Sequence, residues 1–146
     1  MADDGPQLPQ LSTYNERINQ TPVAGTWSGQ RGESLFYSNK PEVTDYINEG
    51  IKYKNGYPDL SPITIHEVRV GKISSDRKAN FKMADEALAQ QLGVSRKEVT
   101  QMRKSQDLTF HEVEDMRTMQ LMPSKPHSKL GHLGGVGEAK RLEALQ

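Results

Sequence analysis

Near its C-terminus the chain reads LTFHEV at residues 108–113, TMQLMP at residues 118–123 and HSKLGHLGG at residues 127–135, and these runs give the clearest indication of the fold. The first two runs are short and strand-like, with a polar turn between them, which predicts a β-hairpin of strands Leu108–Val113 and Arg117–Leu121. A helix is expected from about Ser124. Three of the four histidines of the chain lie inside this window, so metal chemistry or acid-base chemistry has to be considered first.

A minimal one-metal nuclease needs a cation that holds the scissile phosphate and a base that activates water. A β-hairpin followed by a helix is a compact way to build it, and here it delivers His111 from a strand and His127 from the helix. His132 lies five residues beyond His127, so both can face one ion only if the helix ends near Gly131. We predict that His127 and His132 bind the metal. We favour His111 as the base, because a neutral imidazole titrates near the working pH.

These motifs resemble the HNH and endonuclease VII superfamily, in particular the toxin nucleases named for a Trp-His-His motif. Members carry an aromatic residue followed by His and then His or Glu, a downstream Met-Gln-Leu-x-Pro, and a His with a second His before a Gly-Gly pair. The matching stretches here are 110–112, 119–123, 127 and 132–135, with weaker similarity at 27–34 and 80–86. The resemblance implies a metal-dependent endonuclease that hydrolyses DNA as an antibacterial toxin domain.

This sequence departs from that pattern at two positions. Phe110 stands where the motif has Trp, which should change packing and not chemistry. Glu112 stands where many members carry the second histidine, and this leaves two divisions of labour. Either His111 is the general base and Glu112 assists it or binds metal, or His111 is a metal ligand and Glu112 is the base. Both residues are therefore candidate catalytic residues.

The cofactor expected at this site is a divalent metal ion. The chain has no cysteine, so the ligands must be nitrogen or oxygen atoms. The residues do not select among magnesium, zinc, manganese and nickel. His66 lacks comparable neighbours in the sequence and is interpreted as an ordinary strand residue. Neither His66-Glu67 nor His111-Glu112 continues to the second histidine of a zinc-protease helix, which argues against a peptidase.

Length and composition favour one domain. A chain of 146 residues with 34% hydrophobic residues can bury a single modest core. We predict a flexible arm or linker over residues 1–24 and a single nuclease domain over residues 25–146. The expected fold class is α+β, with a ββα-metal core at about residues 107–135 preceded by a small mixed region and a helix pair. A short helical turn is expected at 43–47 and a strand at 63–73.

The helix pair supports a competing function. Residues 80–92 show helical spacing of apolar residues, Gly93 is a stop signal, and Ser95 with Glu98 forms a capping box for a second helix. The pair looks like a helix-turn-helix whose basic second helix could enter a major groove. A DNA-binding regulator without catalysis is therefore the alternative, but it leaves the histidines unexplained. The two helices could instead help a nuclease to hold phosphates.

Charge, hydropathy and the resemblance bear on partners and location. Nineteen basic and nineteen acidic residues cancel, although the middle of the chain is locally basic. No segment is long and apolar enough for a membrane span, and residues 1–4 do not begin a signal peptide, so the chain is expected to be soluble without a membrane partner. The resemblance implies a C-terminal domain of a larger bacterial toxin, delivered into a target cell and neutralised by a cognate immunity protein. The oligomeric state is left open.

Overall fold

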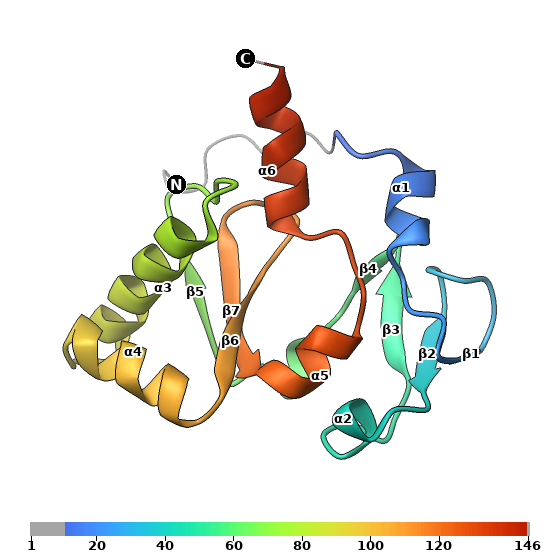
Figure 1. Ribbon diagram of the computed structural model, residues 1–146, viewed down its shortest axis with the longest axis horizontal. Coiled ribbons are helices and arrows are strands. Elements are labelled where there is room, and N and C mark those ends of the chain that lie inside the picture. Colours follow the sequence, from blue (N-terminus) through green and yellow to red (C-terminus); the bar gives the residue numbers. More distant parts are fainter. Residues whose placement is uncertain (1–10, 146) are drawn as a thin grey trace.

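The computed structural model describes residues 11–145 and contains two antiparallel sheets flanked by helices. Strand order is β1-β2-β3-β4 in the first sheet and β5-β7-β6 in the second. Figure 1 shows the three-stranded sheet in the middle of the molecule, with the helix pair α3 and α4 on one side and the four-stranded sheet on the other. The predicted α+β class is confirmed.

The first half of the described chain forms the four-stranded sheet and two short helices. Trp27 packs on Phe36 and Tyr53, with ring centroids 4.9 and 5.0 Å away, so the single tryptophan contributes to the core on this side of the molecule. The short helix α2 begins and ends close to the helical turn predicted at 43–47. The elements are α1 (Tyr14–Asn19), β1 (Gly25–Trp27), β2 (Leu35–Ser38), α2 (Pro41–Thr44), β3 (Ile51–Lys54) and β4 (Tyr57–Pro58).

The second half forms the three-stranded sheet and the larger helices. The strand predicted over 63–73 is shorter in the structure, because a 3-10 turn at Ser61–Ile63 precedes it and Gly71 follows it. The elements are β5 (His66–Arg69), α3 (Arg77–Leu92), α4 (Arg96–Ser105), β6 (Leu108–Glu112), β7 (Thr118–Pro123), α5 (Ser124–Lys129) and α6 (Gly135–Ala144).

The predicted hairpin and helix are present as β6, β7 and α5. β6 and β7 pair antiparallel, with Phe110 opposite Leu121 and His111 opposite Gln120. α5 begins directly after β7 and ends at Lys129, which confirms that the helix ends near Gly131. Successive residues of β7 face two different cores: Leu121 packs in the core that includes α3 and α4, and Met122 packs in the core that includes β2 and β3.

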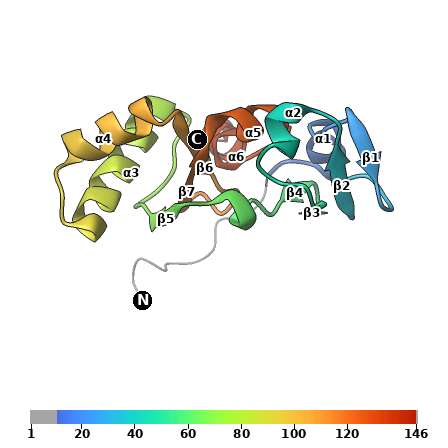
Figure 2. The same cartoon turned by 90° about the horizontal axis from the view of Figure 1, so that it is seen from below.

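The helix pair is also confirmed. Asp76 caps α3 through the backbone N–H of Ala79, and Gly93 ends the helix with a φ of 71°. Ser95 and Glu98 form the predicted reciprocal capping box at the start of α4. The second view shows α3 and α4 as a layer at one end of the molecule (Figure 2). Within residues 11–145, no helix is long and apolar enough to cross a membrane.

The segment expected as an arm contains packed residues. Residues 1–10 lie outside the described part of the chain, whereas Ser12 and Arg17 are buried. The Arg17 guanidinium donates to the Ser12 carbonyl oxygen at 2.7 Å and the Asn55 carbonyl oxygen at 2.9 Å. Glu138 of α6 accepts hydrogen bonds from the Ser12 backbone N–H and from the Tyr57 hydroxyl. Residues 12–21 therefore pack against the domain.

Candidate metal centre and active site

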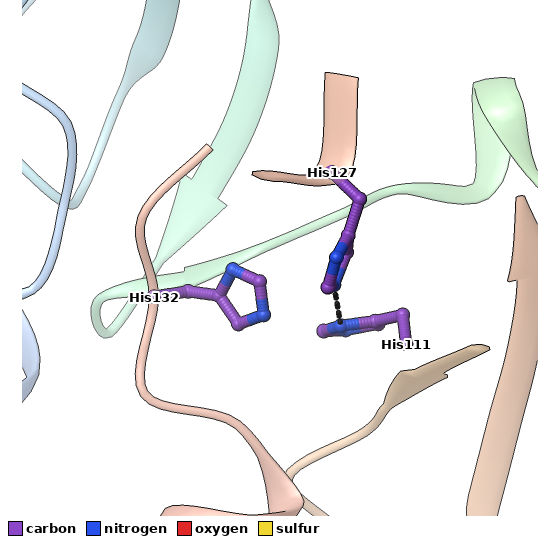
Figure 3. Close-up of side chains that lie close together, drawn as sticks. All are labelled: His111, His127 and His132. Carbon is purple, nitrogen blue, oxygen red and sulfur yellow. Dashed lines mark hydrogen bonds between the residues drawn. The ribbon is translucent and has the colours of Figure 1, made fainter. Parts of the chain in front are cut away.

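Three histidines from three different elements converge on one point. His111 comes from β6, His127 from α5, and His132 from the loop after α5. One ring nitrogen from each can be chosen so that all three lie within 4.8 Å of one another. Figure 3 shows the rings turned toward a common centre, with His111 Nδ1 3.3 Å from His127 Nε2. His66 lies on β5 and does not belong to this cluster.

Close backbone packing holds the loop that carries His132. Gly134 and Gly135 lie against the carbonyl oxygens of Glu112 and Val113, and a Cβ on Gly134 would come within 2.7 Å of the Glu112 oxygen. Only glycine allows so close an approach. The Gly-Gly pair after His132 therefore brings the loop against the end of β6, where His111 lies.

The electrostatic surroundings keep the three imidazoles neutral. Burial is the main cause that lowers the pKa of His111 well below its ordinary value, and the neighbouring His132 and His127 add to it. Burial also lowers the pKa of His127 to about 3, and it lowers the pKa of His132 against the opposing effect of the Leu130 carbonyl. Neutral imidazole is the form that binds a metal ion.

The spacing of His111 and His127 fits a divalent ion, and His132 completes a set of three nitrogens within 4.8 Å of one another. Two nitrogens bound at about 2.1 Å to one tetrahedral ion lie about 3.4 Å apart, and the His111 and His127 nitrogens are 3.3 Å apart. His132 Nδ1 lies 2.6 Å from the Leu130 carbonyl oxygen, and as the donor in that bond it leaves Nε2 with a lone pair for the ion. The donor set therefore suits a metal that accepts nitrogen ligands.

Glu112 has different surroundings from its neighbour His111, because successive residues of a strand point to opposite faces. Its carboxylate accepts a hydrogen bond from Asn80 Nδ2 at 3.0 Å and lies 3.1 Å from a guanidinium nitrogen of Arg77. Asn80 is itself held by Ser74, whose carbonyl oxygen accepts from Nδ2 at 2.8 Å. Burial raises the pKa of Glu112, and the contacts with Asn80 and Arg77 oppose that shift.

A cleft of about 790 Å³ opens over the cluster. His127, His132 and Glu112 line it, together with the cationic side chains of Arg77 and Lys140. The Arg77 side chain is 54% exposed although one of its nitrogens pairs with Glu112, so other N–H groups remain free to meet an anion. An anionic ligand with phosphate chemistry matches this lining.

The sequence predicted the histidines and Glu112 of this site but not the roles of Arg77 and Asn80. In the sequence, Arg77 belongs to a locally basic region and Asn80 to the weakly similar stretch 80–86. They meet Glu112 across 35 and 32 residues of chain respectively. No local spacing in the sequence predicts these contacts, because they form only when α3 packs beside the end of β6.

Comparison with known proteins points to the same region. None of the curated proteins matches the chain. A family model described as the DNase/tRNase domain of colicin-like bacteriocin matches residues 50–134, which is more than half of the chain. The matched residues run from β3 to Gly134 and include the helix pair, Glu112 and all three clustered histidines. The chain therefore belongs to the family of DNase/tRNase domains of colicin-like bacteriocins, which are toxin nucleases.

Proposed function

We propose that this domain hydrolyses DNA phosphodiester bonds with the help of one divalent metal ion bound by His111, His127 and His132. The observation that carries the proposal is the convergence of three neutral imidazole nitrogens within 4.8 Å of one another at a cationic cleft. When bound, the ion would polarise the scissile phosphate and stabilise the leaving oxygen. Imidazole ligands favour zinc or nickel over magnesium.

The geometry favours Glu112 as the general base. The His111 lone pair that faces His127 cannot bind the ion and accept a proton at the same time. Of the two assignments that the sequence leaves open, this favours His111 as a metal ligand and Glu112 as the base. Glu112 lines the cleft, and burial raises its pKa toward the working pH, which makes it a stronger base than an exposed carboxylate. Asn80 and Arg77 orient it.

Arg77 has a second task in this proposal. Its exposed N–H groups face the cleft and can hydrogen-bond to phosphate oxygens, while the ion pair with Glu112 keeps the guanidinium in place. Guanidinium binds phosphate with directed, paired hydrogen bonds. Arg77 therefore positions the phosphate beside the carboxylate that accepts the proton of the attacking water.

The biological setting follows the same reasoning. We propose that the domain acts as part of an HNH-type bacterial toxin, is delivered into the cytoplasm of a target cell and is neutralised by a cognate immunity protein. The family match and the motifs at 110–112 and 119–123 support this setting. The helix-turn-helix regulator is not favoured, because it leaves the histidine cluster without a function.

The first experiment measures metal binding and cleavage together. His127→Ala should weaken the binding of zinc or nickel, measured by titration calorimetry, and should slow plasmid cleavage by roughly 100-fold or more. Chelator should have the same effect on the parent protein. His66→Ala is the matched control, because it removes a histidine outside the cluster. Metal-independent cleavage by the parent would contradict the proposal, and faster cleavage of transfer RNA than of plasmid would reject DNA as the substrate.

The second experiment separates the ligand from the base. Glu112→Gln should retain metal affinity while cleavage falls by about 100- to 10,000-fold, the usual contribution of a general base. His111→Ala should lose metal affinity and cleavage together. If His111→Ala bound metal like the parent and lost only cleavage, the roles would be reversed and His111 would be the base.

A further inference from the structure

A second groove adjoins the metal cleft. It has a volume of about 550 Å³ and lies between α3 and α4. Arg77 and Thr109 line both this groove and the cleft over the histidines. The two depressions therefore lie side by side, with Arg77 and Thr109 between them.

The floor of the groove is fixed by a buried ion pair. Asp85 accepts hydrogen bonds from Arg103 at 3.1 and 2.7 Å and from the Thr100 hydroxyl at 2.8 Å. The Arg103 guanidinium also lies 5.0 Å from the ring centroid of Phe81. The Arg77 guanidinium lies 5.3 Å from the same centroid. Because Asp85 neutralises Arg103, this arginine braces the two helices against each other and adds little net charge to the groove.

The rim of the groove carries positive charge that is not neutralised in this way. Lys78, Lys82 and Lys104 line it and are exposed. Within residues 11–145, no carboxylate lies within 4.0 Å of any of these three amino groups. Lys78 and Lys82 are four residues apart on α3 and so lie on one face, one turn from each other. A line of amino groups thus leads away from Arg77.

We infer that this groove binds the phosphates that flank the cleaved bond, so that the nucleic-acid backbone runs from the metal cleft past Arg77 and between α3 and α4. The inference rests on the proposed nuclease function. Lysine amino groups meet phosphates as point charges and carry no base readout, so the groove supplies affinity and register without sequence preference. The helix pair then works through the residues that line the groove, and Lys97 and Gln101 of α4, which do not line it, are not expected to contact the nucleic acid.

The test compares two triple variants that remove the same number of charges. The groove variant combines Lys78→Gln, Lys82→Gln and Lys104→Gln, which removes the three lysine charges from the rim of the groove. The control variant combines Lys40→Gln, Lys54→Gln and Lys97→Gln, which removes three lysines that do not line the groove. Binding of a labelled DNA duplex is measured in the presence of chelator, which prevents cleavage and removes any contribution of the metal. Metal affinity without DNA checks that each variant is folded.

The groove variant should bind the duplex roughly 10- to 100-fold more weakly at low salt, and its slope of log affinity against log salt should be smaller by about 2 to 3, close to one per lost phosphate contact. The control variant should retain most of the affinity and slope. If the control variant loses as much as the groove variant, or if the groove variant binds like the parent, the inference is overturned.

A small activated phosphodiester distinguishes the two proposals. If the parent with metal does not hydrolyse such a compound or plasmid DNA, the proposed nuclease function fails. If the parent hydrolyses both and the groove variant binds and cleaves plasmid like the parent, only the groove proposal fails.

Discussion

The histidine cluster and the α3–α4 groove lie on either side of Arg77 and differ in charge: the cluster is largely buried and neutral, whereas the rim of the groove is exposed and positively charged. In the cluster, burial removes charge from three titratable side chains and leaves lone pairs that can bind an ion. In the groove, lysines remain exposed and keep a permanent charge for contacts that need no precise geometry. Under the proposed function, burial suits the chemical step because neutral nitrogens can bind the ion, and exposure suits contact with a long polyanion.

The largest effect on this comparison is expected from breaking the ion pair under the groove. Asp85→Ala leaves Arg103, whose side chain is 13% exposed, as a largely buried and uncompensated charge. The free energy of unfolding should fall by about 3 to 5 kcal/mol, measured by urea denaturation. Glu86→Ala is the control, because the pair that Glu86 forms with Arg96 is exposed. Equal stability of the two variants would show that the ion pair does not brace the helices.

A smaller effect is expected from the backbone contact that holds the His132 loop. Gly135→Ala forces a Cβ against the Val113 carbonyl oxygen and should cost about 1 to 3 kcal/mol of stability through overpacking. Because the loop would shift away from β6, metal affinity should fall as well. Gly71→Ala serves as the comparison, since its Cβ would have no heavy atom within 4 Å. Unchanged metal affinity in Gly135→Ala would contradict the proposed part of this contact in placing His132.

Acid should destabilise the folded protein through the histidine cluster. The pKa of His127 is about 3 in the folded protein, below its ordinary 6.5, so the unfolded chain binds more protons between these values. The contribution of His127 to the free energy of unfolding is therefore fully present above pH 6.5. It is lost as the pH falls, by up to about 1.4 kcal/mol per pH unit. Urea denaturation of the metal-free protein from pH 7 to pH 4 measures the slope, which should be smaller in His127→Ala. An equal slope in both would contradict the prediction.

The smallest effect is expected at the turn between the two helices. Ser95→Ala removes the capping box at the start of α4 and should cost about 1 kcal/mol of unfolding free energy, while metal affinity should not change. Ser105→Ala, at the other end of α4, is the matched variant and should cost less. A loss of metal affinity in Ser95→Ala would show that the helix pair and the metal centre are coupled.

Local patterns predicted most of the elements that build the site. The alternating runs at 108–113 and 117–121, the stop signal at Gly93 and the capping box at Ser95 all depend on backbone hydrogen bonds and faces within a few residues, and each has its counterpart in the structure. Local patterns do not predict the helix α6, whose buried Glu138 accepts hydrogen bonds from Ser12. A short polar segment gives no local sign that a partner more than 100 residues away will fold over it.

Residue types and local spacing in the sequence set which chemical groups are present, the ββα order that carries them, and the glycines on either side of His132. Long-range packing, in contrast, turns the His111 ring toward His127 and His132 and brings Glu112 against Arg77 and Asn80. Residue type and spacing encode local backbone geometry. The meeting of side chains from separate elements depends on how sheets and helices pack, and that packing also sets the burial that keeps the imidazoles neutral.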